Sequence, residues 1–333
     1  MKKFLAVLLA ALMLFALAAC GGNNATDGNA TAGDASALKA VTIGTGGTAG
    51  TYYAFGGILG GQIKASTGVD ATVVSTDGSK ANILGIETGN YQLGTVQSDV
   101  MAYAWAGSRT FEAEGALDSF RVIGGLYAEA VQLLTMDSEI KSVADLKGKK
   151  VSIGAAGSGV YFNAIDILAA AGLTEADIVP QYQSFADSAD ALKDGKIDAA
   201  FIVAGAPTPA IQELCTTSAN ARLVPIDGEV ADKLMAESPY YTVYNVPAGT
   251  YEGQDADVAT VTVKATLIVS AALSEEDVYN ITKAIFDNID AITAAHAKGA
   301  ELSIENATSG MTAPFHVGAA KYFAEKGVTV ESK

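Results

Sequence analysis

The chain has 333 residues, half of them hydrophobic, and its 37 acidic against 21 basic residues give a formal net charge of −16. A negative field of this size repels nucleic acids and anionic lipid headgroups, so neither is expected as a partner. The length suits two domains rather than one.

The first segment carries an export signal. Lys2 and Lys3 precede an apolar run at 4–17, which is shorter than the ~20 residues that a membrane-spanning helix needs. The following Leu-Ala-Ala-Cys resembles the lipobox of bacterial lipoproteins, in which the cysteine is lipidated and the chain is cut before it; an ordinary cleavage site is the alternative. We predict a signal peptide at 1–19, a lipid on Cys20 and a flexible, polar tether at 20–37.

From residue 38 onward, short β-branched runs alternate with helical patterns. The expected strands are 41–44, 71–75, 93–97, 121–125, 150–154, 197–204, 222–225 and 259–270. The expected helices include 52–67, 160–171, 187–193 and one long amphipathic helix that begins after Ser274 and ends at Lys298. This alternation predicts an α/β fold of open sheets with helices on both faces.

A strand, a Gly-rich turn and a helix start follow one another at 41–52 and again at 150–160. Two such units, far apart in the chain, predict one sheet in each of two lobes: lobe 1 at 38–130 plus 241–333, and lobe 2 at 131–240. Ligands of open α/β sheets bind beyond the carboxyl ends of the strands, where these turns lie. We therefore expect a cleft between the lobes that closes by hinge motion.

Candidate ligand-binding residues occupy four turns that follow strands. Small residues and hydroxyls at helix starts offer backbone N–H groups to negative charge, so a carboxylate can be held without help from the few arginines, Arg109, Arg121 and Arg222. Asp99 is alternatively the cap of the next helix. Tyr52 is expected to form a wall of the cleft. The predicted ligand-binding residues are Thr48, Thr51, Tyr52, Gln97, Ser98, Asp99, Ala155, Ala156, Ser158, Gly159, Ala204, Gly205 and Pro207.

Other chemistries have weaker support in the sequence. His296 and His316 lack the spacing of a zinc motif and suit structural roles, so neither a metal nor a cofactor is expected. Cys215 has no disulfide partner once Cys20 is lipidated, and it suits a buried helix position. The turn at 44–49 satisfies only the loosest dinucleotide-binding pattern. No serine has the surroundings of a hydrolase nucleophile, so no catalytic residue is predicted.

An ordered set of motifs resembles one known family. From about residue 41 to the C-terminal end, the chain is similar to the TAXI group of extracytoplasmic solute receptors, the binding components of tripartite ATP-independent periplasmic (TRAP) transporters. One departure is Val317, where the family often has proline. The matching motifs include G-T-G-G-T-A-G-T-Y-Y at 44–53, V-V-S-T-D-G-S at 73–79, G-T-V-Q-S-D at 94–99, D-L-K-G-K-K-V-S-I-G-A-A-G-S-G at 145–159, A-G-A-P-T-P-A at 204–210 and P-F-H-V-G at 314–318.

The resemblance implies a periplasmic-binding-protein type II fold and a small carboxylate ligand, such as glutamate, glutamine or an organic acid. It implies integral membrane TRAP subunits as partners, driven by an ion gradient, and it places the ligand against 48–52, 97–99, 155–159 and 204–207. We therefore expect a lipid-anchored extracytoplasmic solute-binding protein and not an enzyme. The alternatives are a ligand-sensing lipoprotein that signals to a membrane receptor and a secreted α/β enzyme, for which Asp99 and Glu129 are the plausible acid–base pair.

Overall fold

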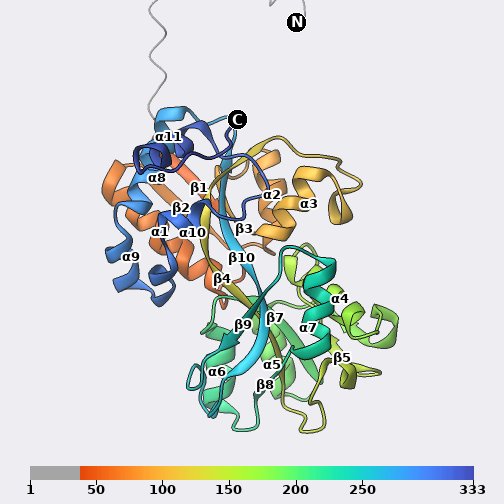
Figure 1. Ribbon diagram of the computed structural model, residues 1–333. Coiled ribbons are helices and arrows are strands. Elements are labelled where there is room, and N and C mark those ends of the chain that lie inside the picture. Colours follow the sequence, from red (N-terminus) through yellow and green to blue (C-terminus); the bar gives the residue numbers. More distant parts are fainter. Residues whose placement is uncertain (1–37) are drawn as a thin grey trace, which may run out of the picture. The chain divides into compact units, whose positions relative to one another are not determined.

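The computed structural model describes residues 38–333, and Figure 1 shows their arrangement. The predicted signal peptide at 1–19, the tether at 20–37 and the lipidation site Cys20 lie outside the described residues. These three assignments stay predictions.

Each predicted strand has a counterpart in the structure. The short strands β6 and β9 are additional, and β4 extends ten residues beyond the predicted 121–125, from Phe120 to Thr135. The strands are β1 (Ala40–Gly44), β2 (Asp70–Val74), β3 (Leu93–Gln97), β4 (Phe120–Thr135), β5 (Lys150–Ser152), β6 (Val179–Gln181), β7 (Ala199–Ala204), β8 (Arg222–Val224), β9 (Thr242–Val246) and β10 (Val258–Ser270).

The strands form one hydrogen-bonded sheet in the order β2-β1-β3-β10-β4-β7-β5-β6, with β9 paired to β10 and β8 paired to β4. β1 runs parallel to β2 and β3, and β5 runs parallel to β6 and β7. β4 and β10 run antiparallel to each other and to their other partners. The two sheets predicted for the two lobes are thus joined, because β4 and β10 are long enough to pass through both (Figure 1).

Helices cover the sheet between the strands. They are α1 (Thr51–Thr67), α2 (Ser79–Glu87), α3 (Ser98–Ala106), α4 (Gly159–Ala170), α5 (Phe185–Lys193), α6 (Pro209–Thr217), α7 (Gly228–Glu237), α8 (Glu275–Phe286), α9 (Ile289–Ala295), α10 (Ile304–Thr308) and α11 (Val317–Glu325), with short 3₁₀ turns at η1 (Arg109–Phe111), η2 (Val143–Leu146), η3 (Glu175–Asp177) and η4 (Ala297–Glu301).

The prediction of one continuous helix between Ser274 and Lys298 is wrong, because two helices occupy this segment. Ser274 caps α8 as expected, since its hydroxyl accepts a hydrogen bond from the Asp277 N–H at 3.1 Å. The helix then ends at Phe286, and α9 begins at Ile289. The side-chain amide of Asn288 donates to the Ala284 carbonyl at 3.0 Å, and such side-chain-to-backbone bonds compete with helix continuation.

The buried apolar residues divide the described chain into two halves. One core cluster takes residues from Val41 to Tyr127 and from Ala265 onward, and two further clusters take residues between Ala130 and Val263. Here lobe 1 denotes the residues packed around the first cluster and lobe 2 those packed around the other two. The predicted boundaries at 130/131 and 240/241 stay predictions.

Candidate functional site

A cavity lies between the two lobes, at the carboxyl ends of the parallel strands in each. Its walls come from the turns after β1, β2, β5 and β6, from the ends of β3 and β7, and from the middle of β4. It offers about 80 Å³ to the centres of water-sized molecules. Because one water needs roughly 10–15 Å³ on this measure, the cavity has room for a small organic molecule.

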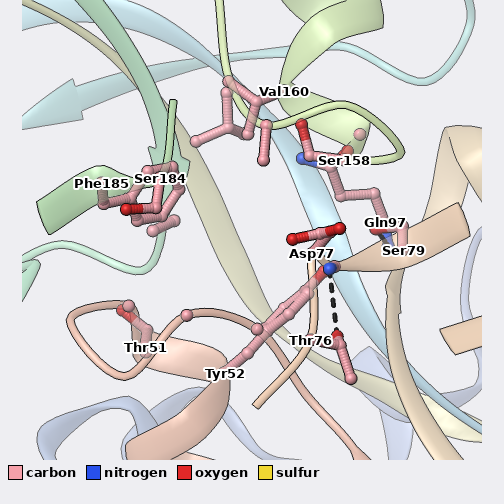
Figure 2. Close-up of a pocket in the computed structure, with 18 of the residues that line it drawn as sticks. Thr51, Tyr52, Thr76, Asp77, Ser79, Gln97, Ser158, Val160, Ser184 and Phe185 are labelled. Atoms are coloured by element: carbon pink, nitrogen blue, oxygen red, sulfur yellow. Dashed lines mark hydrogen bonds between the residues drawn. The ribbon is translucent and has the colours of Figure 1, made fainter. Parts of the chain in front are cut away.

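Four helices begin at the cavity wall. The residues that precede or open α1, α2, α4 and α5 all line it, and Figure 2 shows Thr51, Ser79, Ser158 and Ser184 arranged around the same space. α1, α2 and α4 have no side-chain cap, whereas Ser184 caps α5 by accepting from the Asp187 N–H. Uncapped N–H groups at a helix N-terminus attract negative charge, so these helices contribute positive potential to the wall although no cationic side chain lines it.

The cavity wall contains two carboxyl groups, one exposed at Asp77 and one buried at Glu129. The phenol of Tyr52 donates a hydrogen bond to Glu129 Oε1. Burial is the main reason that the pKa of Glu129 is raised to about 8, and the negative charge of Asp99 adds to it. Glu129 is therefore largely protonated at neutral pH, and its carboxyl group can donate a hydrogen bond as well as accept one.

Seven of the predicted ligand-binding residues line this cavity: Thr51, Tyr52, Gln97, Ala155, Ser158, Gly159 and Ala204. The Thr51 hydroxyl is already engaged, because it donates to the Gly205 carbonyl at 2.8 Å. The Ser158 hydroxyl is buried and has no hydrogen-bond partner among residues 38–333. Of the predicted Thr and Ser hydroxyls that line the cavity, Ser158 is therefore the one that is free to bind a ligand.

The other predicted residues do not line the cavity. Thr48 and Ala156 are exposed, with Thr48 in a neighbouring surface hollow. Ser98 is buried and accepts a long hydrogen bond from the Lys264 N–H at 3.3 Å. Gly205 and Pro207 also lie outside the cavity wall, and the Gly205 carbonyl is engaged by hydroxyls of Thr51 and Thr208.

Asp99 is buried behind the residues that line the cavity. Its side chain is fully buried and accepts a hydrogen bond from Asn163 Nδ2 at 2.9 Å. Burial raises the pKa of Asp99 to about 6. The alternative of a helix cap does not hold for its side chain, because α3 begins at Ser98 without a side-chain cap. Asp99 is not among the residues that line the cavity.

Several cavity residues were not among those predicted. Thr76, Asp77 and Ser79 follow β2, and their turn is stabilised by the Thr76 hydroxyl, which accepts from the Gly78 N–H at 3.0 Å (Figure 2). The rule that ligands gather beyond strand ends applies to this turn as well and could have identified it. Gln183 and Phe185 follow β6, a strand that the sequence pattern did not reveal.

The three arginines are engaged elsewhere. Arg109 forms a two-pronged ion pair with Asp166, its nitrogens lying 2.6 and 3.0 Å from the carboxylate oxygens. Arg121 contacts Asp118 and backbone carbonyls, and Arg222 contacts carbonyls of the segment before η2. None of them lines the cavity, which leaves helix N-termini as its source of positive potential.

The ring nitrogens of the two histidines contact nearby backbone N–H groups. His296 Nδ1 accepts from the Lys298 N–H at 3.1 Å, and His316 Nδ1 accepts from the Gly318 N–H at 3.1 Å at the start of α11. Within residues 38–333, no group of three or more His, Cys, Asp and Glu side chains has metal-site geometry. No helix in this part of the chain combines the length and apolar character needed to cross a membrane.

Comparison with known proteins finds one matching family and several structures of similar fold. Residues 43–327 match the NMT1-like family. A putative L-cystine ABC transporter protein from Listeria monocytogenes shares 18% identity and a TM-score of 0.50, over 80% of this chain and 98% of that chain. A protein from Bordetella bronchiseptica RB50 shares 18% identity and a TM-score of 0.51, over 86% of this chain and 88% of that chain. The periplasmic aliphatic sulphonate binding protein SsuA from Escherichia coli shares 18% identity and a TM-score of 0.44, over 86% of this chain and 90% of that chain. The likeness to the Bordetella and Listeria structures confirms the predicted α/β, periplasmic-binding-protein type II fold.

Proposed function

We propose, from the premise that this chain belongs to the NMT1-like family, that it is an extracytoplasmic solute-binding protein that holds a small carboxylate between its lobes. The observation that carries this proposal is the convergence of four helix N-termini on a cavity without cationic side chains. The Listeria monocytogenes neighbour is named as a transporter protein and not as an enzyme, which supports binding without turnover.

The wall supplies donors of the kind that a carboxylate requires. Backbone N–H groups at the starts of α1, α2 and α4 are uncapped, and the Ser158 hydroxyl has no partner within the described residues. Glu129 does not oppose an anion at neutral pH, because its raised pKa keeps it largely uncharged. Tyr52 and Phe185 add aromatic surface for the apolar part of the ligand.

We further propose that the ligand passes to the integral membrane subunits of a TRAP transporter, and that a lipid on Cys20 holds the protein at the membrane. Both proposals rest on the sequence motifs. The likeness to the Listeria ABC transporter protein extends to the fold alone, so it does not decide between transporter classes. Co-purification with TRAP subunits and an acyl mass on residue 20 are the measurements that check them.

Calorimetric titration of the purified full-length protein tests the ligand class. We expect at least one of L-glutamate, L-glutamine, 2-oxoglutarate and succinate to bind, with mass spectrometry of co-purified material guiding the choice. Replacement of the bound carboxylate by a neutral amide should weaken binding about tenfold or more, since a charge-assisted hydrogen bond contributes roughly 1.5–3 kcal/mol. Equal binding of acid and amide, or no binding by the whole set, contradicts the proposal.

A matched pair of serine variants locates the site. Ser158→Ala removes a buried, unpartnered hydroxyl from the cavity wall, and Ser119→Ala removes a buried, unpartnered hydroxyl elsewhere. We expect the first change to weaken binding of the same carboxylate about tenfold and the second to leave it unchanged. A Ser158→Ala variant that binds as tightly as wild type places the ligand elsewhere.

A further inference from the structure

Asn163 is a buried side chain at the centre of a hydrogen-bond network that crosses between the lobes. It lies on α4, one turn after the helix start, with no exposed surface. Its Nδ2 donates to Asp99 Oδ2 at 2.9 Å and to the Tyr241 hydroxyl at 2.7 Å. Its Oδ1 accepts from Gln97 Nε2 at 3.0 Å. The amide of Asn163 thus has partners from both lobes.

The carboxylate of Asp99 determines which group donates and which accepts in each hydrogen bond of this network. An ionised carboxylate such as Asp99 only accepts hydrogen bonds, so the amide nitrogen of Asn163 must face it. The amide oxygen of Asn163 then faces Gln97 and requires the nitrogen of that amide. The Gln97 oxygen is consequently directed away, toward the start of α4, where a Cβ added to Gly159 would lie 1.5 Å from it.

The two sides of the network belong to separately packed cores. Val96 and Val100 flank Gln97 and Asp99 and pack in lobe 1, whereas Val160 and Ala164 flank Asn163 and pack in lobe 2. The polar contacts between them exist only while the lobes lie together. A buried polar side chain exchanges its partners for water when the lobes separate, so the network favours closure without making it irreversible.

An ion pair continues the network to the surface. The Tyr241 hydroxyl donates to Asp166 Oδ2 at 3.2 Å, and Asp166 is held by Arg109. The Arg109 guanidinium lies 4.9 Å from the centroid of the Tyr103 ring on α3 and 5.4 Å from that of Phe162 on α4. Arg109 also has a backbone φ of 53°, an uncommon value for a residue other than glycine. The buried amide of Asn163 and the ion pair between Arg109 and Asp166 therefore both connect α4 to the segment from β3 to η1.

We propose that Asn163 is a positioning residue for ligand capture, which holds the cavity-lining Gln97 against the start of α4 and so keeps the lobes closed around the ligand. The inference rests on the proposed binding function. Gln97 touches the cavity, while Asn163 and Asp99 act through it. Loss of Asn163 frees the Gln97 amide to rotate and removes the buried contacts between lobes. The ligand then leaves faster, because contacts that had to break before opening are absent.

The test compares Asn163→Ala with Asn82→Ala. Asn82 is an equally buried asparagine whose three hydrogen bonds, to Thr45, Thr76 and Thr95, all stay within lobe 1. Binding is measured with the carboxylate from the titration set that wild type binds most tightly. We expect both variants to lose thermal stability, but only Asn163→Ala to release this carboxylate at least tenfold faster in stopped-flow measurements. Equal dissociation rates in the two variants reduce Asn163 to a structural residue and overturn the inference.

Two further measurements keep the inference testable if Asn163→Ala folds poorly. Arg109→Gln removes the half-exposed ion pair and should also raise the dissociation rate, by several-fold. In a double-mutant cycle, Gln97→Ala should weaken binding in wild type and have little further effect beside Asn163→Ala. Additive effects, or an Arg109→Gln variant that releases ligand at the wild-type rate, contradict the inference. If wild type binds no member of the set, it is the proposed function that fails, and the inference falls with it.

Discussion

Glu129 shows how a single residue can shape both the stability and the chemistry of the site. Its side chain is 1% exposed on β4, between Tyr52 from α1 and the buried layer that contains Tyr127, Lys298 and Asp99. Burial outweighs the stabilising hydrogen bond from Tyr52 and the positive charge of Lys298, so the net pKa shift is upward. The ionised form is therefore the costly one in the folded protein.

This shift predicts a specific pH dependence of stability. The pKa of Glu129 rises from its ordinary value of 4.5 to about 8 on folding, so the folded state binds more protons between these values. Its contribution is fully present below pH 4.5 and is lost as the pH rises through 8. Glu129→Gln removes this dependence, and should stabilise the ligand-free protein relative to wild type by on the order of a few kcal/mol more at pH 9 than at pH 4.5.

Urea unfolding at the two pH values measures the difference. The exposed Glu87, at the end of α2, provides a control in which Glu87→Gln should follow the wild-type pH profile. A Glu129→Gln variant whose stability changes with pH in parallel with wild type shows that the carboxyl group is ionised in the folded protein. The neutral carboxyl invoked in the site would then be wrong.

At the scale of elements, the start of α4 depends on the absence of a side chain. Gly159 opens the helix directly beneath the Gln97 amide, and a Cβ there would meet Gln97 Oε1 at 1.5 Å. Contacts this short force the neighbouring side chain to move, at a cost of about 1–3 kcal/mol. Because Gln97 belongs to lobe 1 and Gly159 to lobe 2, the displacement acts on the contact between the lobes.

We therefore expect Gly159→Ala to weaken carboxylate binding about tenfold or more. Gly57→Ala is the matched control, because Gly57 lies within α1 and its added methyl group would meet no atom within 4 Å. That change should leave the dissociation constant unaltered and stabilise the protein by up to about 1 kcal/mol, as alanine favours helices over glycine. Calorimetric titration and thermal unfolding of the two variants measure both quantities. Wild-type affinity in Gly159→Ala is the contradicting result.

The sequence predicts elements best where one pattern dominates. Alternating or β-branched runs identify β1, β3 and β10, but only the first part of β4. The remainder of β4 is buried on both faces between β10 and β7, so it has no alternation to detect, and it includes Glu129 and Gln132. Their hydrogen-bond partners, Tyr52 and Tyr251, are distant in the chain. Only the folded structure brings these residues together.

The candidate site was also only partly predictable from the sequence. Turns after β1 and β5 have Gly-rich sequences and were identified, whereas the turn after β6 follows a three-residue strand that contains Pro180. Phe185 and Ser184 were missed for this reason. The network around Asn163 was also out of reach, since Asp99 looked equally suited to a cap or a ligand contact. Its actual partner lies 64 residues away on another helix.

At the scale of the whole described region, β4 and β10 are the two strands that connect the lobes (Figure 1). Their pairing is interrupted by register shifts between Lys264 and Thr266 and between Leu267 and Ile268, next to the change from one core to the other. Irregular pairing concentrates bending in a few residues while each core stays intact. The geometry supports a hinge at this level of the sheet, with the cavity beside it.

A pair of spin labels across the cavity provides a direct measurement of hinge closure. Thr48 and Ala156 are exposed and lie in the turns before α1 and α4, one in each lobe, so labels at Thr48→Cys and Ala156→Cys disturb no buried contact. The cavity lies between the two lobes, so separation of the lobes would open it to solvent, and we expect the empty protein to populate open forms. We expect double electron–electron resonance to show a shorter and narrower distance distribution on saturation with the carboxylate.

Labels at Thr48→Cys and Glu87→Cys, both in lobe 1, control for changes within one lobe, and their distance should not respond to ligand. In the Asn163→Ala background the cross-lobe distances should stay broad at a ligand concentration that narrows them in the parent protein, because the buried contacts that favour closure are gone. An unchanged cross-lobe distance at saturation, with binding verified by calorimetry, means that the lobes do not move and that the ligand reaches the cavity through local motion of its turns.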